Sequence, residues 1–220
     1  MAIICAVTNS NGSVYYALMQ TYGDDIDCAC MPILAINDGP FLTLVALGAS
    51  GLADIPIMSL VAALVPIIAG MILGNLDNKV TEFFGPVGDA IIPFTGFSLG
   101  AGIDLANVLK GGVSGIVLGL ITIFIGGGFI YLCDHFIGRR PGYAAWAVAT
   151  TAGNAVAVPA VIGTADPALG RNFVGTATVQ VAASTVLSAL LVPFIVSWWA
   201  KKFGCPKFPK EAKAEKASGK

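Results

Sequence analysis

Two short polar clusters interrupt apolar stretches of this sequence and hold the side chains best suited to binding a ligand. Residues 9–12 read Asn-Ser-Asn-Gly, and residues 150–154 read Thr-Thr-Ala-Gly-Asn. Asn and Thr side chains supply donors and acceptors for hydroxyl groups. A helix that restarts after a break presents free N–H groups and a partial positive charge, which suit a carboxylate. The candidate ligand-binding residues are therefore Asn9, Asn11, Thr151 and Asn154, with hydrogen bonds to the local backbone as the alternative role.

Asp38 is a carboxylate in the middle of a long apolar stretch, between Asn37 and Gly39-Pro40. A charged side chain inside a bilayer is costly, so its presence there is by default a hypothesis of function. Burial favours the protonated form of a carboxyl group, which suits a group that takes up a proton on one side and releases it on the other. We expect Asp38 to be the proton-coupling residue. The alternative is a structural hydrogen bond to residues 9–12.

Gln180 occupies the position that matches Asp38 if the two polar clusters correspond. Asp38 follows Asn11 by 27 residues, and Gln180 follows Asn154 by 26. Gln180 therefore joins the candidate ligand-binding residues. Its alternative role is a hydrogen bond between two packed helices, which is common in membrane proteins.

The stretches that carry the two clusters are predicted to be interrupted helices. Ala144–Gly163 is long enough to cross a bilayer, because about 20 residues at 1.5 Å each span the hydrocarbon. Gly153 and Pro159 weaken that helix, and backbone groups freed in lipid must be satisfied by protein or a cavity. Residues 6–23 repeat the pattern of 147–164. Paired interruptions are typical of a transporter site, whereas an ordinary Gly/Pro kink is the alternative.

Composition places the chain in a membrane. Hydrophobic residues make up 56% of the sequence and charged residues 11%, with a mean hydropathy of +0.82, whereas a soluble domain carries about 25% charged residues. The net charge of −1 offers no basic surface for nucleic acid. The five cysteines lack the spacing of redox or zinc pairs, and the clustered His, Asp or Arg of an intramembrane enzyme are absent from the sequence. We expect no catalytic residue, no metal and no cofactor.

Apolar windows bounded by charges and turn residues predict an all-α integral membrane protein with about seven transmembrane segments. With the C-terminus in the cytoplasm, ten of the twelve Lys and Arg residues fall inside, in line with the positive-inside rule, and most of that signal lies in the C-terminal tail. The acidic residues between positions 24 and 27 are expected to form a hydrated turn. The segment limits are 2–21, 28–51, 56–75, 87–106, 112–133, 143–163 and 172–200.

The chain is predicted to have three parts. Residues 1–54 form an interrupted helix and an intact one, residues 55–202 form five segments of which the fourth is interrupted, and residues 203–220 are a polar cytoplasmic tail. Because both units end in the same order, we expect three further helices to precede residue 1. Two consecutive units of odd helix number insert with opposite topology, as inverted repeats do.

Five stretches of the sequence resemble the 2-keto-3-deoxygluconate permease family, and together they cover the chain to about residue 202. LGNLD and GxxIDL are the more specific motifs among them. The stretches are NSNGSVYYALMQTYG (9–23), NDGPFLTLVALGASGLA (37–53), LGNLDNKVTEFF (73–84), IPFTGFSLGAGIDL (92–105) and TTAGNAVAVPAVI (150–162).

The resemblance implies a fold and a function. It implies about ten helices in two inverted repeats, with broken fourth and ninth helices that cross, as in the bile-acid and arsenite type transporters. It also implies import of 2-keto-3-deoxygluconate, a small sugar acid, by proton symport across the cell inner membrane, with the substrate bound near the midplane. The family often carries Glu where this chain has Asp38, which is a departure. The expected partners are the sugar acid, H⁺ and the lipid bilayer.

Three other functions stay open. A structural membrane subunit would have polar breaks that satisfy one another and would bind nothing. A truncated remnant would keep part of the fold without transport. Within transporters, sodium coupling is an alternative, because carbonyl groups freed at broken helices coordinate Na⁺ readily.

Overall fold

The computed structural model describes residues 1–37, 40–51, 57–84, 86–87, 90, 94, 97, 105–165 and 167–209. Within these ranges the chain is helical and has no strand, which confirms the predicted all-α class for this part. The first half contains α1 (Ala2–Val7), α2 (Gly12–Tyr22), α3 (Asp25–Ala29), α4 (Met31–Asn37), α5 (Pro40–Ala49) and α6 (Ile57–Leu76). The second half contains α8 (Leu105–Leu120), a π-helical turn η1 (Ile121–Gly126), α9 (Gly127–Phe136), α10 (Tyr143–Val148), a 3₁₀ turn η2 (Asn154–Ala157), α11 (Val158–Ala165) and α12 (Pro167–Phe203).

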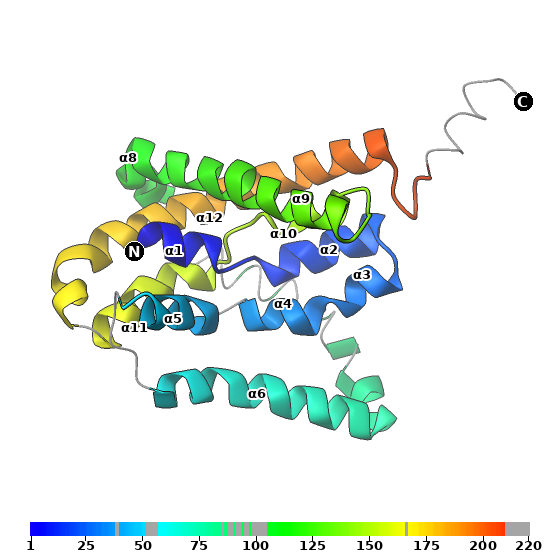
Figure 1. The fold of residues 1–220 in the computed structure, drawn as a ribbon, viewed down its shortest axis with the longest axis horizontal. Helices are drawn as coiled ribbons and strands as arrows, with labels where there is room; N and C mark the ends of the chain where they lie inside the picture. The colour runs from blue at the N-terminus through cyan, green and yellow to red at the C-terminus, as the bar shows by residue number, and fades with distance from the viewer. Residues whose placement is uncertain are drawn as a thin grey trace, which may run out of the picture.

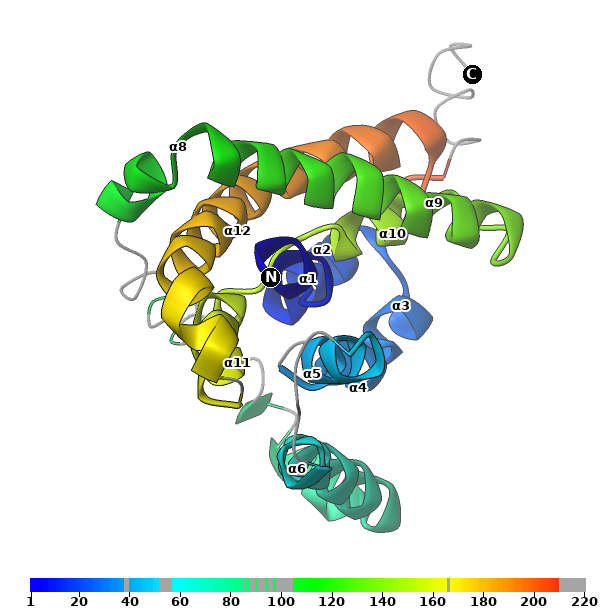
Figure 2. The ribbon, with the colours of Figure 1, turned by 60° about the vertical axis from the view of Figure 1, so that its left-hand side comes forward.

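The helices are stacked in a fixed order across the molecule. α8 bends at Gly112, and from there α8, η1 and α9 follow one another as a single rod that packs along α12. α1 and α2 lie next to this pair (Figure 1). α4 and α5 come next, and α6 is outermost, where it contacts α4 and α5; Figure 2 gives the same order from another side. The interrupted segments therefore lie in the interior of the stack.

Glycines allow the rod to approach its neighbours closely. A Cβ atom at Gly115 would lie 2.5 Å from the Cβ of Ala183, where α8 meets α12. A Cβ atom at Gly127 would lie 2.5 Å from the Cβ of Ala149, just after α10. Small residues at helix contacts are the usual means of close packing in membrane proteins.

Both predicted interruptions are present. α1 ends at Val7 and α2 begins at Gly12, while α10 ends at Val148 and regular α-helix resumes in α11. The Asn11 side chain caps α2, because its Oδ1 accepts a hydrogen bond from the Val14 N–H at 3.1 Å. The first polar cluster thus ends one half-helix and starts the next.

Two separate hydrophobic cores lie on either side of the interruptions. One contains Met19 of α2 and Tyr143 of α10, and the other contains Cys5 of α1 and Ile162 of α11. α12 contributes to both cores. Each interrupted segment therefore gives one half-helix to each core, and its polar break lies between them.

Two helices in the described part are long and apolar enough to cross a membrane. They are Gly112–Phe136 and Phe173–Phe203, and shorter apolar helices lie at Leu64–Leu76 and Asn154–Thr164. The predicted segment 87–106 falls mostly outside the described residues, so the count of seven stays a prediction. α12 begins at Pro167, but its membrane-length part, Phe173–Phe203, agrees closely with the predicted segment 172–200.

The end of α12 is tied to the loop between α9 and α10, and the turn beyond it is tied to the end of α2. Trp199 Nε1 donates to the Pro141 carbonyl at 2.7 Å. Beyond α12, Lys207 Nζ donates to the Gln20 carbonyl, and Cys205 is 5% exposed. The α2–α3 turn, the α9–α10 loop and the end of α12 therefore lie at one end of the molecule (Figure 1).

That arrangement agrees with the predicted topology in placing the three connections on the same side, while the identity of that side stays a prediction. At the start of the predicted polar tail, Gly204 and Cys205 are buried, while Lys207 and Phe208 are exposed but contact α2. Residues 210–220 lie outside the described residues.

Candidate functional site

The two interruptions lie against each other and exchange hydrogen bonds. The Ala152 N–H donates to the Asn9 carbonyl at 2.8 Å. The Asn11 N–H donates to Thr150 Oγ1, also at 2.8 Å. Backbone groups freed in one segment are thus partly satisfied by the other, as an interior break requires. We call residues 8–11 and 149–153 the crossing.

Thr151 is held at the crossing from two directions. Its Oγ1 lies 2.9 Å from Ser184 Oγ and donates to the Ala6 carbonyl at 3.4 Å. Its N–H donates to Ser188 Oγ at 3.0 Å. The side chain is fully buried, so α12 supplies the hydroxyls that replace the missing helical hydrogen bonds of the second break.

At the crossing, the side chain of Asn9 has one buried atom, Oδ1, without a hydrogen-bond partner among the described residues. Its Nδ2 donates to the Cys5 carbonyl at 3.1 Å and to Thr43 Oγ1 at 2.9 Å. A carbonyl can only accept, so the amide nitrogen must face Cys5 and the amide oxygen must point elsewhere. An unpaired buried acceptor costs about 1–3 kcal/mol, which a ligand donor could recover.

The structure brings together some of the candidate residues and separates others. Asn9, Asn11 and Thr151 meet at the crossing. Asn154 begins η2 just beyond it and is exposed. Gln180 Nε2 donates to Ser114 Oγ at 3.1 Å, which links α12 to α8 and matches the helix–helix role named as its alternative.

Asp38 lies outside the described residues, and its proton-coupling role stays a prediction. Its neighbour Asn37 donates from Nδ2 to Ser10 Oγ at 2.7 Å. The end of α4 therefore contacts the first break through Asn37.

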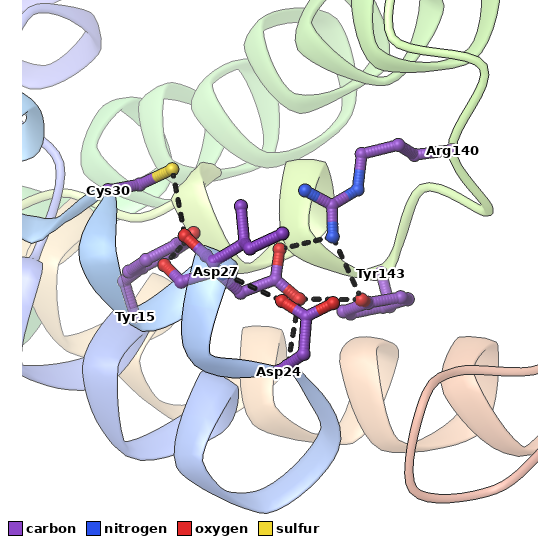
Figure 3. A network of polar contacts seen from close by, with 7 residues as sticks. Tyr15, Asp24, Asp27, Cys30, Arg140 and Tyr143 are labelled. Atoms are coloured by element: carbon purple, nitrogen blue, oxygen red, sulfur yellow. Dashed lines mark hydrogen bonds and ion pairs between the residues drawn. The ribbon is translucent and has the colours of Figure 1, made fainter.

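Asp27 corrects the prediction of a hydrated acidic turn. Its side chain is 1% exposed, and Oδ1 lies 2.5 Å from Nη2 of Arg140, whose side chain is 30% exposed. This contact is an ion pair rather than an aligned hydrogen bond, since no donor in the described residues meets hydrogen-bond geometry at Oδ1. Tyr143 Oη donates to Asp27 Oδ2 at 2.6 Å and accepts from Arg140 Nη2 at 3.2 Å (Figure 3). We call Asp27, Arg140 and Tyr143 the charged cluster.

Backbone geometry holds Asp27 in place. Asp24 caps α3 with a reciprocal pair of hydrogen bonds, in which Asp27 N–H donates to Asp24 Oδ1 at 2.9 Å and Asp24 N–H donates to Asp27 Oδ2 at 3.1 Å. The bond from the Asp27 N–H lowers the pKa of Asp24. Partial burial opposes the charge on Arg140, but Tyr143 and Asp27 outweigh it and raise the pKa of the guanidinium.

A cavity of about 390 Å³ adjoins the charged cluster. Asp27, Arg140 and Asp134 line it together with apolar side chains, and it extends to Val148. Val148 directly precedes the crossing, where its carbonyl accepts from the Thr150 N–H at 2.7 Å. In the described part of the chain, no group of three or more His, Cys, Asp or Glu residues is placed to hold a metal ion.

The charged cluster was missed because its members are far apart in the sequence. Tyr143 and Asp27 are separated by 116 positions. The capping-box spacing of Asp24 and Asp27 was a visible signal for a helix start at that turn. Nothing in one sequence connects that turn with Arg140.

The chain is similar to known proteins over more than nine tenths of its length. The sequence profile of the 2-keto-3-deoxygluconate permease family (KdgT) matches residues 1–205. The 2-keto-3-deoxygluconate permease 1 of Salmonella typhimurium strain LT2 is 49% identical over 202 residues, which are 92% of this chain and 63% of that protein. No solved structure matches the chain.

More distant relatives carry the same name. The 2-keto-3-deoxygluconate permease of Xanthomonas euvesicatoria pv. vesicatoria strain 85-10 is 37% identical over 92% of this chain and 63% of its own length. The 2-keto-3-deoxygluconate permease of Bacillus subtilis strain 168 is 36% identical over 92% of this chain and 61% of its own length. The chain thus spans about three fifths of the length of these relatives.

Proposed function

The chain belongs to the 2-keto-3-deoxygluconate permease family, and on that basis we propose that it is part of a secondary active transporter that imports 2-keto-3-deoxygluconate with a proton. The family consists of permeases, which are membrane transport proteins and not enzymes. In this proposal the sugar acid binds at the crossing, near the middle of the membrane.

The observation that carries the proposal is the meeting of two interrupted helices with one buried acceptor left unpaired. The Ala152 N–H and Asn9 carbonyl join the two breaks, while Asn9 Oδ1 keeps an unused lone pair in a buried place. Discontinuous helices that meet in this way are the usual framework of a transporter binding site.

The uncharged amide and hydroxyl groups of the crossing can bind a small carboxylate that also carries hydroxyl groups. Asn9 Oδ1 can accept from a sugar hydroxyl, and Thr151 Oγ1 can donate or accept. The α2 half-helix begins beside the crossing at Gly12, so its first N–H groups and positive end favour the substrate carboxylate. Asn11, Asn154 and Gln180 complete the proposed set of substrate-binding residues.

Proton coupling is assigned to Asp38 on its place in the sequence. Replacing Asp38 by Asn should abolish uptake driven by a proton gradient while leaving substrate exchange largely intact. Unchanged uptake in that variant would remove Asp38 from the mechanism, and uptake that follows a sodium gradient would replace proton coupling by sodium coupling.

The proposal includes a topology. The transporter lies in the cell inner membrane with the end that contains residues 134–142 and 203–220 in the cytoplasm. Residues 1–54 and 55–202 belong to two inverted repeats, with further helices of the first repeat outside this sequence. The repeated order of interrupted and intact segments supports this arrangement.

A structural subunit that binds nothing is the second candidate function, and one observation favours it. Most polar groups at the crossing already have partners within the chain, among them Thr151, which contacts Ser184 and Ser188. A subunit of this kind needs no substrate, so substrate binding separates the two functions.

The test is binding and uptake of radiolabelled 2-keto-3-deoxygluconate by the chain in proteoliposomes. We expect saturable binding that Asn9→Ala weakens at least tenfold, because about 1.4 kcal/mol of hydrogen bonding corresponds to that factor. Asn11→Ala and Asn154→Ala should also weaken binding more than expression. Asn75→Ala is the matched control, since Asn75 is exposed and bonds only its own helix in the described structure. Absence of binding by the unmodified chain would favour the structural subunit.

A further inference from the structure

The charged cluster is a buried ion pair with one accessible side. Asp27 is almost fully enclosed, whereas Arg140 keeps 30% of its side chain exposed. Both residues line the cavity of about 390 Å³. An anion in this cavity can therefore approach the guanidinium group without unfolding any element around Asp27.

The cavity and the crossing share a neighbour in α10. Val148 lines the cavity, and its carbonyl accepts from the Thr150 N–H within the crossing. The cavity therefore lies next to the chain segment that leads into the crossing. The charged cluster stands at the end of the molecule where the α2–α3 turn and the α9–α10 loop meet (Figures 1 and 3).

From this geometry we propose that the charged cluster is a second subsite for the sugar acid, in which the substrate carboxylate replaces Asp27 on Arg140 when Asp27 takes up a proton. This inference rests on the proposed transport function. It adds a site that is charged and lies beside the crossing rather than in it.

The exchange balances in charge and in protons. One proton from water binds Asp27 Oδ1, the atom that lies 2.5 Å from Arg140 Nη2, and the ion pair separates. Arg140 keeps its proton, because a guanidinium group is not deprotonated in proteins. It then pairs with the incoming carboxylate in the bidentate geometry that Arg favours. The site holds one cation and one anion before and after the step, so no uncompensated charge is buried.

Each group that faces Asp27 and Arg140 has a definable effect on the exchange. The Tyr143 hydroxyl and the Asp24 N–H both donate hydrogen bonds to Asp27 Oδ2, so they hold the carboxylate in place while Oδ1 faces Arg140. Asp134 lines the same cavity and opposes an incoming anion. The other titratable groups around the cluster are Asp24, Tyr15, Cys28 and Cys30.

The experiment measures binding and proton uptake together, using the full chain and labelled 2-keto-3-deoxygluconate in weakly buffered solution with a pH indicator. We expect binding at this subsite to take up about one proton per substrate, and the dissociation constant to rise with pH. Asp27→Asn should take up about one proton fewer per substrate bound than the unmodified chain, because Asp38 is unchanged, and its affinity should depend less on pH. Asp25→Asn, which changes an exposed neighbour, should behave as the unmodified chain.

Arg140 provides the second half of the test. Arg140→Gln should lose at least tenfold in affinity, because the carboxylate loses a charge-assisted hydrogen bond. Arg139→Gln is its matched control, since Arg139 is exposed and adjacent. Asp134→Asn should leave the proton count unchanged and strengthen binding, because it removes a repelling charge while Asp27 remains.

Tyr143→Phe keeps the inference testable if Asp27→Asn does not fold. It removes the 2.6 Å hydrogen bond to the Asp27 carboxylate, so the substrate should displace Asp27 from Arg140 more readily and bind about tenfold more tightly at alkaline pH. Unchanged proton uptake in Asp27→Asn, or unchanged affinity at alkaline pH in Tyr143→Phe, would overturn the subsite. If the unmodified chain bound no substrate, the proposed function itself would fail, which is a different result.

Discussion

The crossing and the charged cluster join the same two segments of the chain in opposite ways. At the crossing, backbone amides and hydroxyls of residues 9–11 and 150–152 bond one another without any formal charge. In the charged cluster, a carboxylate that is 1% exposed faces a guanidinium group across 2.5 Å. Neutral hydrogen bonds contribute about 0.5–1.5 kcal/mol each, whereas breaking a buried ion pair costs about 3–5 kcal/mol.

Because of this difference, the crossing and the charged cluster suit different roles. The neutral contacts of the crossing can be exchanged for ligand contacts one at a time at little cost. The charged pair is stable while both partners are charged and is weakened by a single proton. We therefore expect the crossing to tolerate individual changes and the charged cluster to respond to them sharply.

The largest effect is expected from Arg140→Gln, which removes the cation of the charged cluster. Asp27 would be left buried without its cation, so the free energy of unfolding should fall by about 3–5 kcal/mol. Thermal unfolding of the purified chain in detergent measures the change, and Arg139→Gln should have almost none. Adding Asp27→Asn should recover part of the loss, and a double variant as unstable as the single one would contradict the ion-pair account.

Gly127→Ala tests how closely the crossing is packed. The new Cβ would lie 2.5 Å from the Cβ of Ala149, so the free energy of unfolding should fall by about 1–3 kcal/mol through overpacking. Gly128 has nothing within 4 Å of its Cβ position, and Gly128→Ala should be neutral or slightly stabilising. Equal unfolding temperatures for the two variants would show that the backbone around Ala149 shifts to make room for the added methyl group.

Thr151→Val measures how much one neutral hydrogen bond at the crossing contributes to stability. The substitution keeps the shape of the side chain and removes the hydroxyl that contacts Ser184 Oγ at 2.9 Å. We expect a loss of about 1 kcal/mol in stability. Thr21→Val, which removes an exposed hydroxyl bonded within its own helix, serves as the control in the same unfolding measurement. A loss as large as that of Arg140→Gln would remove the contrast between the two regions.

The smallest effect is expected from Asp24→Ala, and it depends on pH. The Asp27 N–H lowers the pKa of Asp24 in the folded chain, so the contribution of this carboxylate is present above its unfolded pKa of about 3.9. It should disappear as the pH falls through the lowered folded value. The difference in unfolding temperature between the unmodified chain and Asp24→Ala should therefore be small near neutral pH and vanish in strong acid. Asp25→Ala should give no such difference at any pH.

Sequence reasoning found the crossing because its signals are local. Gly12, Gly153 and the polar residues beside them are out of place in apolar helices, and their spacing in two segments predicted a pair of breaks. The meeting of the breaks came from the resemblance to a family, and the hydrogen bond between Ala152 and Asn9 agrees with it.

Sequence reasoning missed the charged cluster because ion pairing across the fold leaves no local pattern. Asp27 lies among other acidic residues, which is typical of a hydrated turn, and its burial depends on Tyr15, Arg140 and Tyr143. Gln180 fits two roles at once. Its position in the repeat predicts substrate binding, and its contact with Ser114 fits the helix–helix hydrogen bond named as its alternative, so its binding role stays a prediction.

The division into two hydrophobic cores has a consequence for the evolution of the family. One core contains Met19 and Tyr143, the other Cys5 and Ile162, and polar breaks separate them. A change of volume in one core can be compensated by a neighbour in the same core, but not across the breaks. Substitutions that accumulate among relatives should therefore covary in two blocks, each containing half of both interrupted segments. Among the described residues, α12 and the rod of α8 and η1 contribute to both cores, the rod through Leu118 and Ile123, so these two elements should show covariation with both blocks.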